Sequence, residues 1–299
     1  MHFPIIKRLC TRHLPYGPAI PSVCAIGGIL SRMLTLPKNL HRMAPRKPPI
    51  PRSRLLGAPI DFIGSAEALE LAISAMRERS HLQFGDINVS KLVDMQADAE
   101  LRRCCEESDI VCADGMGIVW GCRLLGVPVK ERVPGIDLMS AIVGACAKHG
   151  FRPYFLGARQ SVVEDMVARL KIEHPRLEIA GYRNGYFDAS DEPAIVAEIT
   201  ASGADCLFVG ISTPIKEKFM NRYRDDLRVP VQMGVGGSFD VLSGHIRRAP
   251  AAVQRIGLEW LFRLAQEPRR LARRYYVSNS KFFFMLVRGM FSGMRNRSA

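Results

Sequence analysis

The chain has 299 residues, of which 47% are hydrophobic, and this is enough to bury a substantial core in one large domain or two modest ones. Its eight cysteines include no C-x-x-C pair, which favours buried thiols in a cytosolic protein over a disulfide framework or a zinc site. The net charge of +13 comes from the two ends, because residues 1–60 contain ten Lys or Arg and no acid and residues 249–299 contain ten against two acids. Basic ends on a mildly acidic body suit contact with an anionic surface or polymer.

Residues 1–55 are predicted to form a basic, proline-rich extension without stable structure, and folded sequence is expected to start near Leu56. The charge-free run from 14 to 31 contains three prolines, which disfavour a membrane-spanning helix. A membrane-associated arm and a cleaved signal sequence are the alternatives for this segment.

From residue 56 to residue 248, apolar runs alternate with amphipathic segments. The predicted helices are one carrying Ala68, Leu71, Ala72, Ala75 and Met76, and those at 98–107, 117–126, 135–150, 161–175, 191–203 and 214–227; the predicted strands are 109–114, 152–158, 177–187, 205–212 and 229–240. Strands that alternate with helices of this length predict a Rossmann-like α/β fold, with a mostly parallel sheet covered on both faces.

Several polar or glycine-rich segments follow directly on predicted strands. Ligands of parallel sheets bind at the carboxyl ends of the strands, so we expect Asp114, Gly157, the segment 210–214 and the segment 234–240 to meet at one edge.

The last of these segments carries three glycines, Gly234, Gly236 and Gly237, which would let backbone amides approach a phosphate. A tight turn without a ligand is the alternative. Asp240 follows as a candidate partner of a ribose or base, or else as a carboxylate at a helix N-terminus.

Six segments, in this order, resemble the bacterial WecG/TagA/CpsF glycosyltransferases over about residues 56–285: DINVSKLV, ADGMGIVW…ERVPGIDLM, YFLGA, LFVGISTPIKEKF, GVGGSFDVLSGHIRRAP and GLEWLFRLAQEPRRLARRY. The resemblance implies a hexosyltransferase that uses a UDP-sugar. The sugar, N-acetylmannosamine or another hexose or uronic acid, would pass to a polyprenyl-diphosphate-linked saccharide during bacterial surface polysaccharide synthesis. The enzyme would lie on the cytoplasmic face of the membrane.

The resemblance assigns Asp114 as the general base, where the residue pattern alone leaves a helix cap as the alternative. A sugar hydroxyl is a poor nucleophile, so a carboxylate within reach should take its proton during attack. We expect the helix after Gly115 to favour the charged carboxylate. Arg132 is predicted to bind phosphate, with an ion pair to Glu131 or another carboxylate as the alternative.

Two positions depart from the family's pattern. Asn88 matches its T-x-N segment and is assigned to orient a hydroxyl, but Asp86 stands in place of the Thr. Lys216 stands where the family usually has Gln, beside the retained Glu217. Together with Gly210, these two residues are predicted to bind the donor, and the cation suggests contact with a carboxylated sugar or a phosphate.

No D-x-D pair of carboxylates occurs in the sequence, so we expect neither a metal nor another cofactor. Cationic side chains would then neutralise the departing UDP. Inversion by a single displacement is the simplest chemistry for such a site.

Residues 249–299 are predicted to be an amphipathic, membrane-associating appendage, with a single helix over 251–264 that carries an apolar stripe including Trp260. The following FFFMLV run is too short to cross a bilayer. The resemblance assigns three arginines, Arg263, Arg270 and Arg273, to the acceptor diphosphate. A solvated basic face is the alternative.

Other functions suit the sequence less well. The main alternative is a nucleotide-sugar enzyme that acts on a soluble acceptor. A nucleic-acid-binding module is disfavoured because the body is acidic and contains no RNA-binding signature. The expected partners are therefore the UDP-sugar, the lipid-linked saccharide and an anionic membrane, with a homo-oligomer left open.

Overall fold

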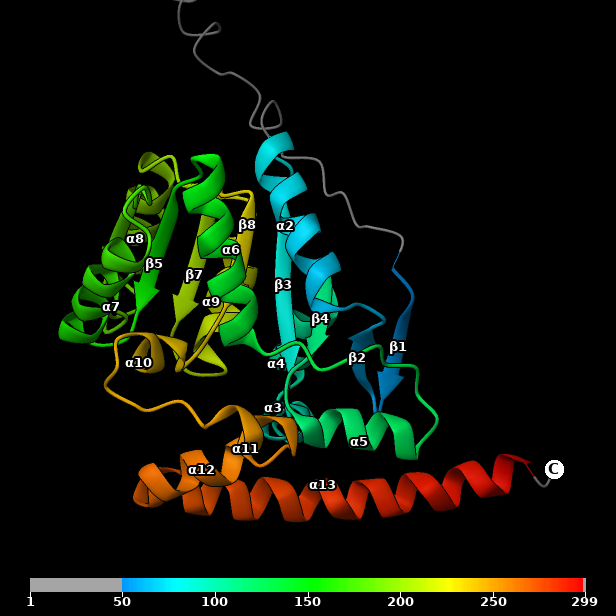
Figure 1. Ribbon diagram of the computed structural model, residues 1–299. Coiled ribbons are helices and arrows are strands. Elements are labelled where there is room, and N and C mark those ends of the chain that lie inside the picture. Colours follow the sequence, from blue (N-terminus) through cyan, green and yellow to red (C-terminus); the bar gives the residue numbers. More distant parts are fainter. Residues whose placement is uncertain (1–49, 298–299) are drawn as a thin grey trace, which may run out of the picture. The chain divides into compact units, whose positions relative to one another are not determined.

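A computed structural model describes residues 50–297, which contain a six-stranded parallel sheet (Figure 1). The strand order is β4-β3-β8-β7-β5-β6. The strands are β3 (Leu82–Ile87), β4 (Ile110–Ala113), β5 (Pro153–Gly157), β6 (Gly181–Arg183), β7 (Cys206–Gly210) and β8 (Val231–Gly234). Because all neighbours run parallel, all six strands end at the same edge, which is the edge where the candidate residues were expected.

Helices cover both faces of the sheet. One face carries α2 (Ser65–Glu78), α6 (Gly135–His149) and α7 (Gln160–Glu173), and the other carries α3 (Val89–Asp94), α4 (Ala99–Glu107), α5 (Met116–Leu124), α8 (Glu192–Ala201) and α9 (Ile215–Arg222). Side chains alternate along each strand and point to opposite faces of the sheet. Phe155 therefore packs under the helices of the first face, whereas Tyr154 and Leu156 pack under the helices of the second face. The expected α/β architecture is confirmed.

A short antiparallel hairpin of β1 (Arg52–Leu55) and β2 (Ala58–Asp61) precedes the sheet. Its Asp61 accepts hydrogen bonds from Arg52 Nε at 2.7 Å and from Val111 N at 2.7 Å, which ties the hairpin to β4. Within the described residues, regular structure therefore begins four residues ahead of Leu56. The rest of the predicted extension, residues 1–49, lies outside the described residues.

The C-terminal segment consists of α10 (Ser238–Leu242), α11 (Ala251–Arg255), α12 (Glu259–Gln266) and α13 (Pro268–Arg297). The expectation of one helix over 251–264 is wrong. Gly257 adopts a φ of 77°, which a helix cannot include, so the chain turns there before α12 begins. Pro268 then starts α13, in the first helical position that proline favours.

Helix α13 packs against the body on the side of α3 and α5 (Figure 1). Phe282 is 7% exposed and belongs to the second-face core, and Leu271 is also buried. A Cβ atom at Gly121 of α5 would lie only 2.9 Å from the Phe282 ring, so the two helices approach closely at this glycine. Within residues 50–297 no helix is long and apolar enough to cross a membrane.

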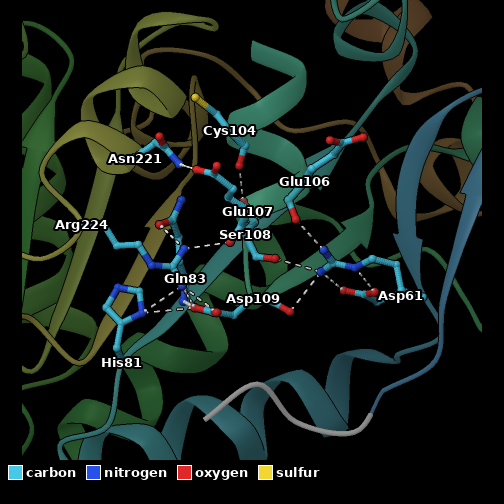
Figure 2. Close-up of polar contacts among 11 residues, drawn as sticks. Asp61, His81, Gln83, Cys104, Glu106, Glu107, Ser108, Asp109, Asn221 and Arg224 are labelled. Atoms are coloured by element: carbon cyan, nitrogen blue, oxygen red, sulfur yellow. Dashed lines mark hydrogen bonds and ion pairs between the residues drawn. The ribbon is translucent and has the colours of Figure 1, made fainter. Parts of the chain in front are cut away.

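A polar cluster joins β3, β4 and α9 at the amino ends of the strands (Figure 2). Asp109 accepts hydrogen bonds from Gln83 N at 2.8 Å and from Arg224 Nη2 at 2.6 Å, and His81 Nδ1 lies 3.1 Å away. Burial opposes its charge, but His81 and Arg224 together lower the pKa of Asp109. This cluster holds the end of the sheet opposite to the candidate site.

We predict that Asp109→Asn lowers the free energy of unfolding at pH 7 by about 1–3 kcal/mol, because the Arg224 guanidinium loses its anionic partner. The loss should shrink as the pH falls through the lowered pKa of Asp109, since wild type then loses the same charge. Urea unfolding at several pH values measures both effects. Glu106→Gln, which breaks an exposed pair with Arg54, is the control and should cost less than about 1 kcal/mol.

Candidate functional site

The candidate base lies at the carboxyl edge of the sheet, directly after β4. Asp114 N donates to Ile87 O at 2.9 Å, which fixes it beside the end of β3. Val133 N donates to Ala113 O at 2.9 Å, so the loop that carries Arg132 runs along the same strand end. The structure thus brings Asp114 and Arg132 together, although eighteen positions separate them in the sequence.

The environment of Asp114 favours its protonated form. Burial, followed by the negative charge of Asp86, raises the pKa of Asp114 to about 7, against the opposing effect of Lys91 and Arg132. The expectation that the following helix keeps this carboxylate charged is therefore wrong, because burial outweighs the helix N-terminus. A group with a pKa near neutrality is well matched to general acid–base work.

Four charged side chains form a buried network beside Asp114. Lys91 Nζ lies 2.7 Å from Asp86 Oδ1 and 2.7 Å from Glu217 Oε1. Lys216 Nζ pairs with the same Glu217 oxygen, donates to Thr213 at 2.9 Å and lies 3.9 Å from Asp86. We call Asp86, Lys91, Lys216 and Glu217 the charge network.

Each charge in the network depends on its partners. Burial disfavours the ammonium of Lys91, which is 1% exposed, yet Asp86 and Glu217 raise its pKa well above the usual range. Burial likewise opposes the charge of Glu217, and Lys91 and Lys216 lower its pKa. Removing one partner of such a buried set typically costs about 3–5 kcal/mol.

Local structure explains why Lys91 points inward. Asn88 is the N-cap of α3, and its side-chain oxygen accepts a hydrogen bond from Lys91 N at 3.0 Å. Its amide nitrogen lies 3.4 Å from Asp86. Asn88 thus caps the helix that aims Lys91 at the network, a role that the sequence analysis did not foresee.

Lys216 is only 4% exposed, and its ammonium lies within the charge network. Its contact with Glu217 neutralises the positive charge from which a carboxylated sugar was inferred. A buried lysine that already has anionic partners offers little attraction to an outside carboxylate. The departure from the family's Gln therefore supports a structural role for Lys216.

The glycines of the candidate donor site differ in their surroundings. A Cβ atom at Gly210 would lie 2.6 Å from the Phe239 ring, and one at Gly234 would lie 2.8 Å from Lys216 Cε. Gly236 has a φ of 52° and open space around it, and a Cβ atom at Gly237 would collide with the Arg263 guanidinium. Gly236 and Gly237 thus form the less buried part of the loop, and Asp240 follows in the first turn of α10.

The three arginines assigned to the acceptor diphosphate lie on two helices. Glu267 sits between the first two, 3.7 Å from Arg263 Nε and 2.6 Å from Arg270 Nη2. Arg273 is exposed on α13, one turn beyond Arg270. The junction before Pro268 separates Arg263 from the other two, so one continuous helix does not align the three residues.

Arg132 forms an ion pair with a carboxylate other than that of its sequence neighbour. Its Nη1 lies 3.1 Å from Glu259 Oε2, whereas Glu131 accepts a hydrogen bond from Ser65 N at 2.5 Å. Arg248 approaches the same Glu259 at 3.8 Å. The ion pair that the sequence analysis kept as the alternative for Arg132 is therefore present.

Sequence reasoning missed Lys91, Arg248 and Glu259. The sequence did mark Glu259, because Glu259 and Glu267 are the two acids of an otherwise basic segment. In the structure each of them pairs with arginines. Nothing in the local pattern marks Lys91 as buried. Among residues 50–297, no three or more His, Cys, Asp or Glu side chains are grouped as metal ligands.

Comparison with known proteins gives two kinds of match. The model of the family described as "Glycosyl transferase WecG/TagA/CpsF family" matches residues 53–296. The N-acetylglucosaminyldiphosphoundecaprenol N-acetyl-beta-D-mannosaminyltransferases of Bacillus spizizenii (strain W23) and Bacillus subtilis (strain 168) are 37% and 35% identical to this chain over 166 residues. Each alignment covers 56% of this chain and 64% of the relative.

We predict that Asp114→Asn becomes more stable relative to wild type as the pH rises from 5 to 8. The folded pKa of Asp114, about 7, lies above that of an unfolded aspartate, so between these two pKa values the folded state holds a proton that the unfolded state has released, and wild type loses stability as the pH rises. Urea unfolding at both pH values measures the difference. The exposed variant Asp188→Asn should show no such trend, and an Asp114→Asn difference that stays flat with pH would refute the raised pKa.

Proposed function

The chain belongs to the WecG/TagA/CpsF family of glycosyl transferases, and from this premise we propose that it transfers a sugar from a UDP-sugar to a polyprenyl-diphosphate-linked saccharide. The observation that carries the proposal is Asp114, a part-buried carboxyl at the carboxyl edge of the sheet whose pKa is about 7. The names of the two Bacillus relatives support a polyprenyl-linked acceptor and an N-acetylmannosamine donor.

The proposed reaction is a single displacement at the anomeric carbon. A hydroxyl oxygen of the acceptor saccharide attacks that carbon and its proton passes to the Asp114 carboxylate. The new C–O bond forms as the bond to the UDP oxygen breaks, and UDP leaves with the electron pair. Attack on the face opposite to UDP inverts the anomeric configuration, and Asp114 later returns its proton to solvent.

Arginines at the site would stabilise the charge that develops on UDP. Arg132 lies near Asp114, and Arg263 lies against the glycine loop at Gly237. Guanidinium groups suit phosphate oxygens because they donate two parallel hydrogen bonds. Because the charge of Lys216 is already neutralised within the protein, the donor that we propose carries an uncharged sugar such as an N-acetylated hexosamine.

We propose further that α13 and its neighbours rest on an anionic membrane surface, which would bring the lipid-linked acceptor to the site. Exposed aromatic side chains support this: Phe283 is 61%, Phe284 70% and Phe291 62% exposed. The same helix carries many arginines, which anionic headgroups attract. The cytoplasmic face of a bacterial membrane is the side that we propose, because the resemblance to the family implies it.

The base assignment is tested by Asp114→Asn, which keeps the size of the side chain but cannot accept the proton. Turnover in a radiolabelled transfer assay with a polyprenyl-diphosphate-linked N-acetylglucosamine acceptor should fall by roughly 10²–10⁴. UDP binding should change little, and Asp188→Asn should match wild type. Turnover within threefold of wild type in Asp114→Asn would reject this base.

The membrane proposal is tested on neighbouring phenylalanines with opposite surroundings. Replacing the exposed Phe283 and Phe284 by Ser should reduce co-sedimentation with phosphatidylglycerol vesicles at least tenfold, because each ring buries apolar area in the interface. The melting temperature should change little. Phe282→Ser should instead lower it, since that ring is buried in the core. Unchanged vesicle binding in the double variant would contradict the proposed membrane-facing side.

A further inference from the structure

Two arginines from distant parts of the chain converge on one carboxylate of the C-terminal segment. Arg132 Nη1 lies 3.1 Å from Glu259 Oε2, and Arg248 Nε lies 3.8 Å from Glu259 Oε1. The side chains are part-buried, with Arg132 16%, Glu259 29% and Arg248 31% exposed. One carboxylate thus bridges two guanidinium groups.

Two donors of Arg248 form no hydrogen bond within the protein. Its Nη1 is 2.6 Å from Asp137 Oδ1, but its Nε and Nη2 are buried and have no hydrogen-bond partner in the protein. A guanidinium carries five N–H donors, and a buried donor without an acceptor costs free energy. These atoms therefore favour a ligand with more acceptor oxygens than the carboxylate of Glu259 supplies.

The negative charge of Glu259 also reaches the candidate base. Its charge acts on the neighbouring Asp114, so two negative groups repel each other whenever Asp114 is ionised. Glu259 stands in the first turn of α12, on a segment that follows the turn at Gly257. It thus stands at the start of a short helix that is separate from α11.

We propose that Arg132 and Arg248 form a cradle for the diphosphate of the nucleotide donor, and that Glu259 is an internal anion which holds both arginines until the diphosphate replaces it. This inference rests on the proposed function, because it takes the site beside Asp114 as the donor site. A diphosphate offers several oxygens to two guanidinium groups, and each group can bind them in a bidentate fashion.

Replacement of Glu259 would couple donor binding to the C-terminal segment. Arg263 lies on the same helix, one turn after Glu259, and its guanidinium rests against Gly237 of the glycine loop. Release of Glu259 thus frees the amino end of the helix that carries this arginine. Thermodynamic coupling is reciprocal, so a ligand or surface that displaces α12 from the body should in turn increase the affinity for the nucleotide.

The test is calorimetric titration of the full chain with UDP and with UMP. Glu259→Gln removes the competing charge and should lower the Kd for UDP about tenfold, the scale of one charge-assisted hydrogen bond. Arg248→Gln should raise that Kd about tenfold. UMP, which has a single phosphate, should respond less to either change. Glu106→Gln, the same substitution in an exposed ion pair at the other end of the sheet, should leave both affinities unchanged.

The outcomes separate this inference from the proposed function. If wild type binds UDP and Glu259→Gln binds it equally or more weakly, Glu259 is a structural partner of the arginines and the inference is overturned. Glu259→Asp, which keeps the charge on a shorter stem, guards against misfolding and should leave UDP affinity below that of Glu259→Gln. If wild type binds neither nucleotide, the donor site itself is misplaced and both proposals fail.

Discussion

The ammonium group of Lys91 lies between two carboxylates inside the protein, and the carboxyl edge of the sheet is built around this contact. It joins Asp86 at the end of β3, the strand beside the candidate base, to Glu217 in α9. Burial opposes the charge of Glu217, and Lys91 together with Lys216 offsets that cost. The position of Asp86 in turn helps to keep a proton on Asp114.

The charge network also shows how a sequence departure can be misjudged. Asp86 and Lys216 each differ from the family's usual residue, and each was considered alone as a change in ligand contact. In the folded chain they lie 3.9 Å apart, and Asp86 pairs with Lys91 while Lys216 pairs with Glu217. An added anion and an added cation that meet in the interior compensate each other, and the net charge of the network is zero.

Sequence patterns predicted the sheet and the place of Asp114 because they depend on local alternation and on one general rule about strand ends. They could not predict which carboxylate pairs with Arg132, because Glu131 is adjacent in sequence whereas Glu259 lies 127 positions away. The break at Gly257 was missed for a different reason, since the apolar spacing continues across it although the backbone does not. The raised pKa of Asp114 required the burial that only tertiary structure supplies.

Gly121 is the point where α5 meets α13, and α5 begins two residues after Asp114. Contact this close leaves no room for a spacer between the helix proposed to lie on lipid and the loop that holds the base. If α13 lies on the bilayer, the height of the base above the headgroups is set by rigid packing and not by a hinge. The enzyme would then select its acceptor by the length of the lipid-linked glycan. A glycan too short or too long for that height would present the wrong hydroxyl to Asp114.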